Sequence, residues 1–226
     1  MPPDDPRARR SRVDLQRVHR AMRSLSILKR AIARLDIHVP PRRILELGAG
    51  DGTLLLRLLR AQRARWPGGD LILLDQHDLV SEATRAHFVA LGWSVQVLRV
   101  DAMEWARSVH RDHYDLCLTM LFLHHFQTPA LTELLAGVAS STDAFIACEP
   151  RRNALGRLGS RLLFLLGVND LTREDGMLSV AAGFAASELS ALWPQSSEAW
   201  RIEEYFAPPF THCFAVRRSV RPTRHP

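Results

Sequence analysis

The strongest constraint on the fold of this chain is a glycine-rich run that follows a short apolar stretch. Residues 44–47 are mostly apolar and suit a buried parallel strand. Gly48, Gly50 and Gly52 then occupy alternate positions, and the leucines of residues 54–59 follow at helical spacing. Glycine lets the backbone turn sharply and approach a ligand closely, because it has no Cβ. A strand, a glycine turn and a helix in this order are typical of the first βα unit of a nucleotide-binding domain.

The acidic residues around these glycines indicate which ligand the turn holds. A dinucleotide site usually reads G-x-G-x-x-G, whereas this run places Glu46 two positions before the first glycine and Asp51 within the turn. Acidic groups suit a cationic ligand better than a pyrophosphate. The run resembles motif I of the class I S-adenosylmethionine-dependent methyltransferases, whose E/D-x-G-x-G-x-G loop holds the amino-acid part of the cofactor. A nicotinamide site, or a glycine turn that binds nothing, are the alternatives. The resemblance implies cofactor contacts from Glu46, Gly48, Ala49, Gly50 and Gly52.

Composition fits one globular domain. The chain has 226 residues, of which 46% are hydrophobic and 24% charged, which is ordinary for a soluble α/β domain. The net charge is +6, and Lys29 is the only lysine. Such an arginine skew often comes from a GC-rich coding sequence, so the charge is weak evidence for nucleic-acid binding. The charge alone therefore does not lead us to expect a nucleic-acid partner.

Cysteine usage indicates neither a metal site nor disulfides. Cys117, Cys148 and Cys213 lie far apart, with no CxxC pair and no metal-ligand spacing. Residues after Met1 do not resemble a secretory signal, and the apolar stretch 162–168 is too short to span a bilayer. We expect a cytoplasmic protein without a membrane span, either a monomer or a homodimer.

The chain reads as one domain with two short flanking segments. Residues 1–12, rich in proline and arginine, and residues 219–226 are expected to be disordered. Residues 13–35 carry apolar side chains at three- and four-residue steps, which predicts an amphipathic helix with arginines on its other face. This helix either closes over the cofactor or packs on the sheet. Residues 13–218 are expected to form a single methyltransferase domain.

Two later strands end in acids that suit an adenosine. The second predicted strand ends at Asp75, which can accept hydrogen bonds from ribose hydroxyls and also fits a nicotinamide enzyme. Gln76 follows, where it can lie along the adenine. Residues 94–100 predict the third strand. In the methyltransferases that the chain resembles, an acid after this strand accepts from the adenine amino group, which implies that Asp101 and Ala102 contact the base.

Residues 114–126 are the second informative stretch, because an apolar strand runs into Leu-His-His. The stretch resembles motif IV of small-molecule class I methyltransferases. Ligands of open α/β sheets bind beyond the carboxyl ends of the strands, so the resemblance places Met120 against the cofactor and His124 and His125 near the methyl group. A histidine can take a phenolic proton near neutral pH. The alternative is that the histidines only shape the loop.

Residues 151–195 form the variable part of the chain, where methyltransferases of this class commonly build a substrate lid. Its apolar character suits a partly apolar substrate, and Arg173 and Asp175 are candidate lid residues. A packing or dimer face is the alternative. The remaining patterns predict helices from Thr53 to near Trp66, over 81–91, from Thr128 and over 187–192, and strands over 71–75, 144–148, 198–206 and 210–217.

The patterns predict an α/β fold, and the resemblance implies a Rossmann-like, seven-stranded methyltransferase sheet, mostly parallel with an antiparallel last strand, plus an N-terminal helix and a helical lid. The expected function is S-adenosylmethionine-dependent methyl transfer to a small, partly apolar metabolite of secondary metabolism, as an O-methylation of a phenol, polyketide or quinone. An RNA- or protein-modifying methyltransferase and a non-catalytic Rossmann domain are the alternatives. Against nucleic-acid modification, the N/D-P-P-aromatic run of amino-group methyltransferases is absent from motif IV.

Overall fold

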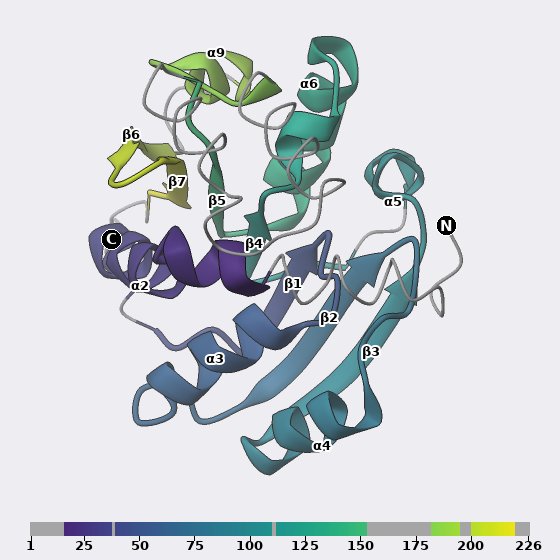
Figure 1. The fold of residues 1–226 in the computed structure, drawn as a ribbon. Helices are drawn as coiled ribbons and strands as arrows, with labels where there is room; N and C mark the ends of the chain where they lie inside the picture. The colour runs from purple at the N-terminus through teal and green to yellow at the C-terminus, as the bar shows by residue number, and fades with distance from the viewer. Residues whose placement is uncertain (1–15, 38, 110–111, 153–181, 195–199, 220–226) are drawn as a thin grey trace, which may run out of the picture.

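The computed structural model describes residues 16–37, 39–109, 112–152, 182–194 and 200–219. Within these residues, seven strands form one sheet with helices on both faces (Figure 1). The strands are β1 Arg43–Leu47, β2 Gly69–Asp75, β3 Trp93–Arg99, β4 Leu116–Met120, β5 Ala144–Pro150, β6 Trp200–Ala207 and β7 Thr211–Arg218. The helices are α2 Ser24–Leu35, α3 Thr53–Gln62, α4 Glu82–Ala90, α5 Ala102–Arg107, η1 Leu123–His125, α6 Thr128–Ser141 and α9 Glu188–Leu192.

The strand order fixes where a ligand can bind. The order is β3-β2-β1-β4-β5-β7-β6, in which β1 to β5 pair in parallel and β7 is antiparallel to both of its neighbours. The predicted fold class is thus confirmed. From β1 the strands β2 and β3 extend the sheet to one side, and β4 and β5 extend it to the other. The sheet order therefore reverses between β1 and β4, and open sheets bind ligands at the carboxyl ends of the strands that flank such a switch point.

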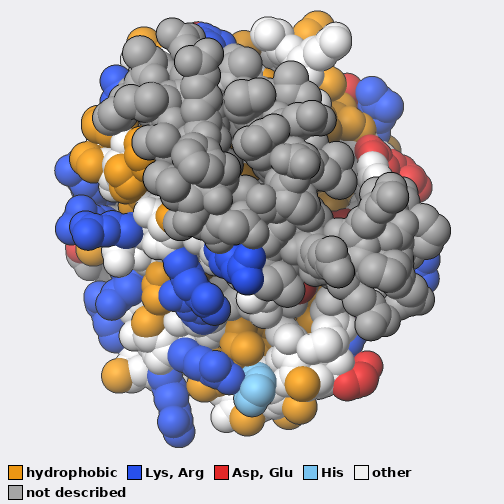
Figure 2. All heavy atoms as spheres, in the orientation of Figure 1, with side chains coloured by type: hydrophobic (Ala, Val, Ile, Leu, Met, Phe, Trp, Pro, Cys, Tyr) orange, Lys and Arg blue, Asp and Glu red, His pale blue; other side chains and the backbone are white. Residues whose placement is uncertain are grey.

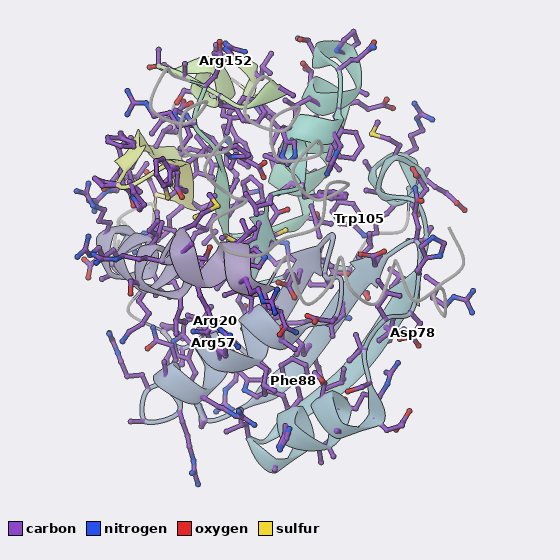
Figure 3. The ribbon with its side chains drawn as sticks, viewed as in Figure 1. Arg20, Arg57, Asp78, Phe88, Trp105 and Arg152 are labelled. Atoms are coloured by element: carbon purple, nitrogen blue, oxygen red, sulfur yellow. The ribbon has the colours of Figure 1, made fainter. Side chains whose placement is uncertain are left out.

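Successive side chains of a strand point to opposite faces of the sheet, so each face has its own hydrophobic core. Ile44 and Leu71 belong to the core that α2, α3 and α4 cover, whereas Leu45 and Leu47 belong to the core under α5, α6 and α9. Trp105 is buried in the second of these cores, on α5 (Figure 3). Both faces of the central strands are buried, which is why β4 and β5 are apolar at most positions, whereas the edge strand β3 carries polar residues and is buried only in part.

The N-terminal helix differs from its prediction, because it is broken. Residues 16–21 are helical, a turn follows, and α2 begins only at Ser24. Arg23 adopts a left-handed conformation with φ of 55°, which ends one helix while its carbonyl accepts the first hydrogen bonds of the next. The apolar spacing continues across this position, so the pattern of the sequence did not reveal the break.

Some predictions fall outside the described residues. These are the disordered segment 1–12, most of the tail 219–226, and the lid residues Arg173 and Asp175. Helix α5 was not predicted, and α3 ends at Gln62 rather than near Trp66. Asp101 caps α5, since its Oδ1 accepts hydrogen bonds from Met103 N at 2.7 Å and Glu104 N at 3.3 Å.

Candidate active site

The glycine loop is held against the end of β2 by three backbone donors. Gly48 N and Ala49 N donate to the carbonyl of Leu74 at 2.9 and 3.1 Å. Gly50 N donates to Asp75 Oδ2 at 3.0 Å. The three glycines of the loop have φ between +54° and +69°, a region that other residues adopt at an energetic cost. Hydrogen bonds within the protein therefore define the shape of the loop.

The glycines differ in what surrounds them. A Cβ added at Gly50 would have no described atom within 4 Å, so Gly50 borders open space. A Cβ added at Gly48 would lie 2.4 Å from the ring of Phe122. Gly48 is therefore needed for packing against the loop after β4, whereas Gly50 exposes the backbone where a ligand can approach. The sequence alone did not distinguish these two roles.

Glu46 places a buried acidic group beneath this loop. Its residue is 6% exposed, and among the described residues its Oε2 atom has no hydrogen-bond partner. Burial raises the pKa of Glu46 well above its ordinary value, and the charges of Asp51 and Asp75 raise it further. A buried carboxylate oxygen without a donor, among other acids, suits the ammonium group of an amino-acid ligand. The residues of this loop therefore fit S-adenosylmethionine.

The residues predicted to bind the adenosine come together at the same edge of the sheet. Gln76 Nε2, after β2, donates to Asp101 Oδ2, after β3, at 2.7 Å. Hydrogen bonds, chiefly from Met103 N, lower the pKa of Asp101. Ala102 is buried at the start of α5. Asp75 is occupied by protein donors in this structure, with Gly50 N on Oδ2 and His77 N on Oδ1 at 3.1 Å.

Of the two arrangements that the sequence left open, packing on the sheet is observed, since the apolar side chains of α2 belong to the core that it shares with the strands. The helical turn before α2 also contacts the glycine loop. Gln16 Nε2 donates to Asp51 Oδ2 at 2.7 Å. The other oxygen of Asp51 accepts from Thr53 N at 3.0 Å and from Thr53 Oγ1 at 2.7 Å. Asp51 thus links the N-terminal helix to the start of α3.

The loop after β4 is organised by a carboxylate that the sequence analysis missed. Glu149, fully buried at the end of β5, accepts from Phe122 N and Leu123 N with Oε1 at 3.0 Å each. Its Oε2 lies 2.8 Å from His124 Nδ1. Leu121, directly before this turn, has φ of +54°, a strained conformation that its hydrogen bond to the Cys148 carbonyl stabilises. The available signal was a lone glutamate at the end of an apolar strand.

The two histidines of the loop have different surroundings. His124 is buried against Glu149, whereas His125 is exposed on the same turn. Their ring centroids are 4.2 Å apart. Met120 ends β4 immediately before this loop and is partly exposed. The structure therefore brings the predicted Met120, His124 and His125 to the carboxyl end of β4, beside the glycine loop that follows β1.

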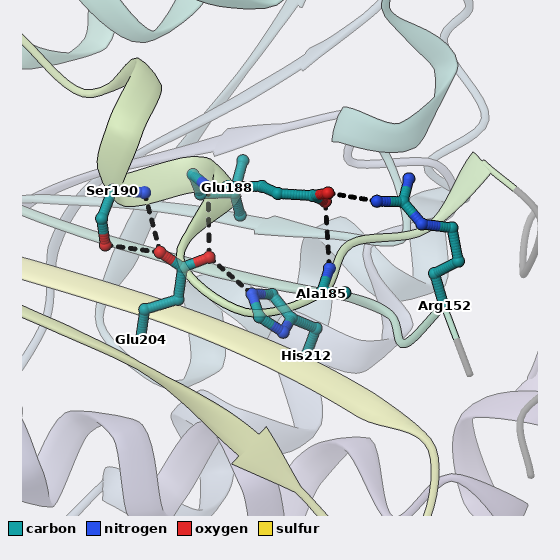
Figure 4. A network of polar contacts seen from close by, with 7 residues as sticks. Arg152, Ala185, Glu188, Ser190, Glu204 and His212 are labelled. Atoms are coloured by element: carbon teal, nitrogen blue, oxygen red, sulfur yellow. Dashed lines mark hydrogen bonds and ion pairs between the residues drawn. The ribbon is translucent and has the colours of Figure 1, made fainter.

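A second histidine–carboxylate pair joins the two strands of the last hairpin (Figure 4). His212 Nε2 is 2.6 Å from Glu204 Oε1, and both side chains are buried. Glu204 also accepts from Leu189 N at 3.1 Å and Ser190 N at 2.7 Å. Burial favours a higher pKa for Glu204, but the hydrogen bonds from His212 and Ser190 outweigh it and lower the pKa. His212 is the cross-strand partner of Glu149, so this edge of β5 and β7 carries two such pairs.

The same network joins α9 to the end of β5. Arg152 pairs with Glu188, which also accepts from Ala185 N at 3.0 Å (Figure 4). Within the described part of the chain, no group of three or more histidine, cysteine or acidic side chains has the arrangement of a metal site. None of the described helices has the length and apolar character needed to cross a membrane.

Comparisons with known proteins agree with this geometry. Residues 44–143 match a family model described as a methyltransferase domain. By structure, the chain is similar to the plantazolicin methyltransferase BpumL in complex with SAH, with a TM-score of 0.62 and 18% identity, covering 96% of this chain and 92% of that one. It is also similar to an O-methyltransferase family protein from Burkholderia thailandensis, with a TM-score of 0.63 and 17% identity, covering 96% of this chain and 61% of that one. Magnesium protoporphyrin IX methyltransferase from Synechocystis has a TM-score of 0.55 and 16% identity, covering 94% and 87% of the two chains. A sequence comparison with curated proteins finds no match.

The family match and the fold agree on the class of protein. Residues 44–143 match a methyltransferase domain, and the described sheet has the seven-stranded, mixed arrangement of the structurally similar methyltransferases. Both findings support a methyltransferase that uses S-adenosylmethionine, which is the class that the sequence predicted.

The buried acid beneath the glycine loop generates a prediction for the variant Glu46→Gln. Because the pKa of Glu46 is raised on folding, the folded protein holds a proton that the unfolded chain releases, so stability falls as pH rises above the ordinary value of 4.5. Glutamine cannot ionise, so the variant should lose this pH-dependent destabilisation. It should also bind S-adenosylhomocysteine roughly tenfold to a hundredfold more weakly, since glutamine cannot release a proton and form an ion pair with an ammonium group.

Urea unfolding at several pH values and calorimetric titration with S-adenosylhomocysteine measure the two effects. Glu82→Gln is the matched control, because the Glu82 side chain is 96% exposed. Unchanged affinity together with an unchanged pH dependence of stability in Glu46→Gln would remove Glu46 from the cofactor site.

Proposed function

We propose that this chain transfers a methyl group from S-adenosylmethionine to a hydroxyl oxygen of a small, partly apolar metabolite, such as a phenol, polyketide or quinone. The observation that carries this proposal is the pairing of His124 with buried Glu149 at the carboxyl ends of β4 and β5. The switch point of the sheet lies between β1 and β4. Gly50, with the open space beside it, follows β1, and the histidine of the pair follows β4. A base therefore stands at the edge where the cofactor and acceptor meet.

The residues of the glycine loop hold and orient the cofactor. Glu46 binds its ammonium group, and Gly50 allows the backbone to approach it. Asp75, Gln76, Asp101 and Ala102 bind the adenosine, which requires Asp75 to exchange at least one of its present protein donors for ribose hydroxyls. When bound, the cofactor supplies an electrophilic methyl group on its sulfonium sulfur. Holding the acceptor in line with that group supplies much of the rate enhancement.

His124 acts as the base for the acceptor hydroxyl. Glu149 accepts two backbone N–H bonds at Oε1, which fix the position of its carboxylate beside His124. Nδ1 of His124 faces the Glu149 carboxylate, so Nε2 is the ring nitrogen to which we assign the proton of the acceptor. Ionising a phenolic oxygen raises its nucleophilicity toward the methyl group. His125, exposed on the same turn, contacts the acceptor.

Other observations support the choice of acceptor and location. The similar Burkholderia protein is described as an O-methyltransferase family protein, and the similar Synechocystis enzyme is described as acting on magnesium protoporphyrin IX; oxygen and small molecules are thus acceptors that suit this fold. The described cysteines are free thiols and buried, which supports a cytoplasmic location. An acceptor of this kind belongs to secondary metabolism.

The acceptor class is tested with labelled cofactor. Purified protein is incubated with S-adenosylmethionine carrying a labelled methyl group and with a whole-cell extract separated by size. Label should appear in the small, organic-extractable fraction, because the acceptor is a partly apolar metabolite. Label in the RNA or protein fraction would instead assign the chain to macromolecule modification.

The role of the histidine pair is tested with His124→Asn. Asparagine keeps a side-chain nitrogen near the position of Nδ1, which preserves the donor to Glu149, but it cannot take a proton. Turnover should fall by about 10²- to 10⁴-fold, while binding of S-adenosylhomocysteine stays unchanged. His125→Ala should lower turnover less. Normal turnover in His124→Asn would reduce the pair to a structural support of the loop.

A further inference from the structure

A cavity with basic walls lies on the α2–α3 face of the sheet. Its volume is about 360 Å³, and three segments that are far apart in the sequence contribute to its walls. Lys and Arg side chains gather on the part of the surface over α2 and α3 (Figure 2), and Arg20 and Arg57 lie close together there (Figure 3). The wall residues that matter for the argument are His19, Arg20, Arg23, Arg30, Arg57 and Pro208.

The cavity opens at the edge of the sheet that carries the active site. Pro208 belongs to the turn after β6, and β6 runs in the same direction as β5, since both are antiparallel to β7. This turn therefore lies at the carboxyl ends of the parallel strands. On the other side, the helical turn that carries His19 is attached to the glycine loop through the hydrogen bond between Gln16 and Asp51. The cavity thus adjoins the cofactor loop.

The positive charge of this cavity is not neutralised by the described protein. Among the residues that the structure describes, no carboxylate lies within ion-pair distance of Arg20, Arg23, Arg30 or Arg57. Elsewhere on the surface, Arg85 pairs with Asp78 and Arg107 with Glu133.

His19 contributes a neutral imidazole ring to the wall of the cavity, which can donate or accept a hydrogen bond but adds no positive charge. Burial lowers the pKa of His19 to about 4. The negative charge of Asp51 opposes this lowering, whereas the positive charge of Arg57 adds to it. Its Nδ1 lies 3.1 Å from Ser24 Oγ. Four guanidinium groups therefore supply the charge around a concave surface of the size that small ligands fill.

We infer that this cavity binds a carboxylate or phosphate group of the methyl acceptor, an inference that rests on the proposed function. Guanidinium groups bind such oxygens with two parallel hydrogen bonds. A nucleic acid would instead require a basic track that follows several phosphates, whereas these arginines converge on one cavity. An anionic group held here leaves the rest of the acceptor to extend along the sheet edge toward His124.

The anion site is tested first without the acceptor. The full chain is titrated with inorganic phosphate at constant ionic strength by calorimetry. Saturable binding is expected for the wild type, and Arg20→Gln/Arg57→Gln should weaken it at least about tenfold. Arg60→Gln/Arg63→Gln is the matched control, since these exposed arginines lie on or just after α3 and outside the cavity; it should bind phosphate like the wild type. All three proteins should bind S-adenosylhomocysteine equally. Absence of phosphate binding in the wild type, or equal binding in the first variant, would overturn the inference.

The acceptor is tested second, in the labelled-extract assay. The labelled product should be retained by an anion-exchange resin, and Arg20→Gln/Arg57→Gln should need more extract to reach the wild-type rate, because the substitution raises KM. A neutral product, or a labelled RNA that displaces phosphate, would overturn the inference. If the wild type labels nothing, the proposed function fails, whereas phosphate binding that depends on Arg20 and Arg57 would still support an anion site.

Discussion

The hydrogen bonds between the glycine loop and the end of β2 are the interaction on which the site depends. Parallel pairing of Leu47 with Leu74 sets the register of β1 and β2, and this register places the Leu74 carbonyl where Gly48 N and Ala49 N can donate to it. Asp75 then receives Gly50 N. The open backbone at Gly50 and the buried acid Glu46 are therefore fixed by strand pairing and by the hydrogen bonds of the loop to β2.

The charges of this edge are arranged in two groups. Glu46, Asp51 and Asp75 gather around the glycine loop and suit a cationic cofactor. Arg20 and Arg57 gather on the adjoining cavity and suit an anionic group. The N-terminal helix joins the two groups, since it reaches Asp51 through Gln16 and lines the cavity with His19 and Arg20. The net charge of the whole chain, by contrast, says little about either ligand.

Local patterns predicted the parts of the structure that depend on local chemistry. Strand and helix periods predicted most elements of the sheet, and the resemblance of residues 46–52 to motif I of the class I methyltransferases implied the strand arrangement and the class of enzyme. Glu149 was missed because its partners at Phe122 and His124 are distant in the sequence. Arg57 and Arg20 line the same cavity only because tertiary packing brings their helices together, so the sequence pattern did not reveal this either. The pairing of Glu204 with His212 was within reach, since aligning the two hairpin strands around their turn brings these residues onto one face.

The most direct test of the central claim is a pair of calorimetric titrations of the full chain, one with S-adenosylhomocysteine and one with NAD⁺. Acids around a glycine loop favour the cationic amino-acid end of the first ligand and repel the pyrophosphate of the second. The account predicts saturable binding of S-adenosylhomocysteine that NAD⁺ does not reduce. Binding of NAD⁺ in competition with it, or no binding of S-adenosylhomocysteine, would contradict the assignment of the glycine loop.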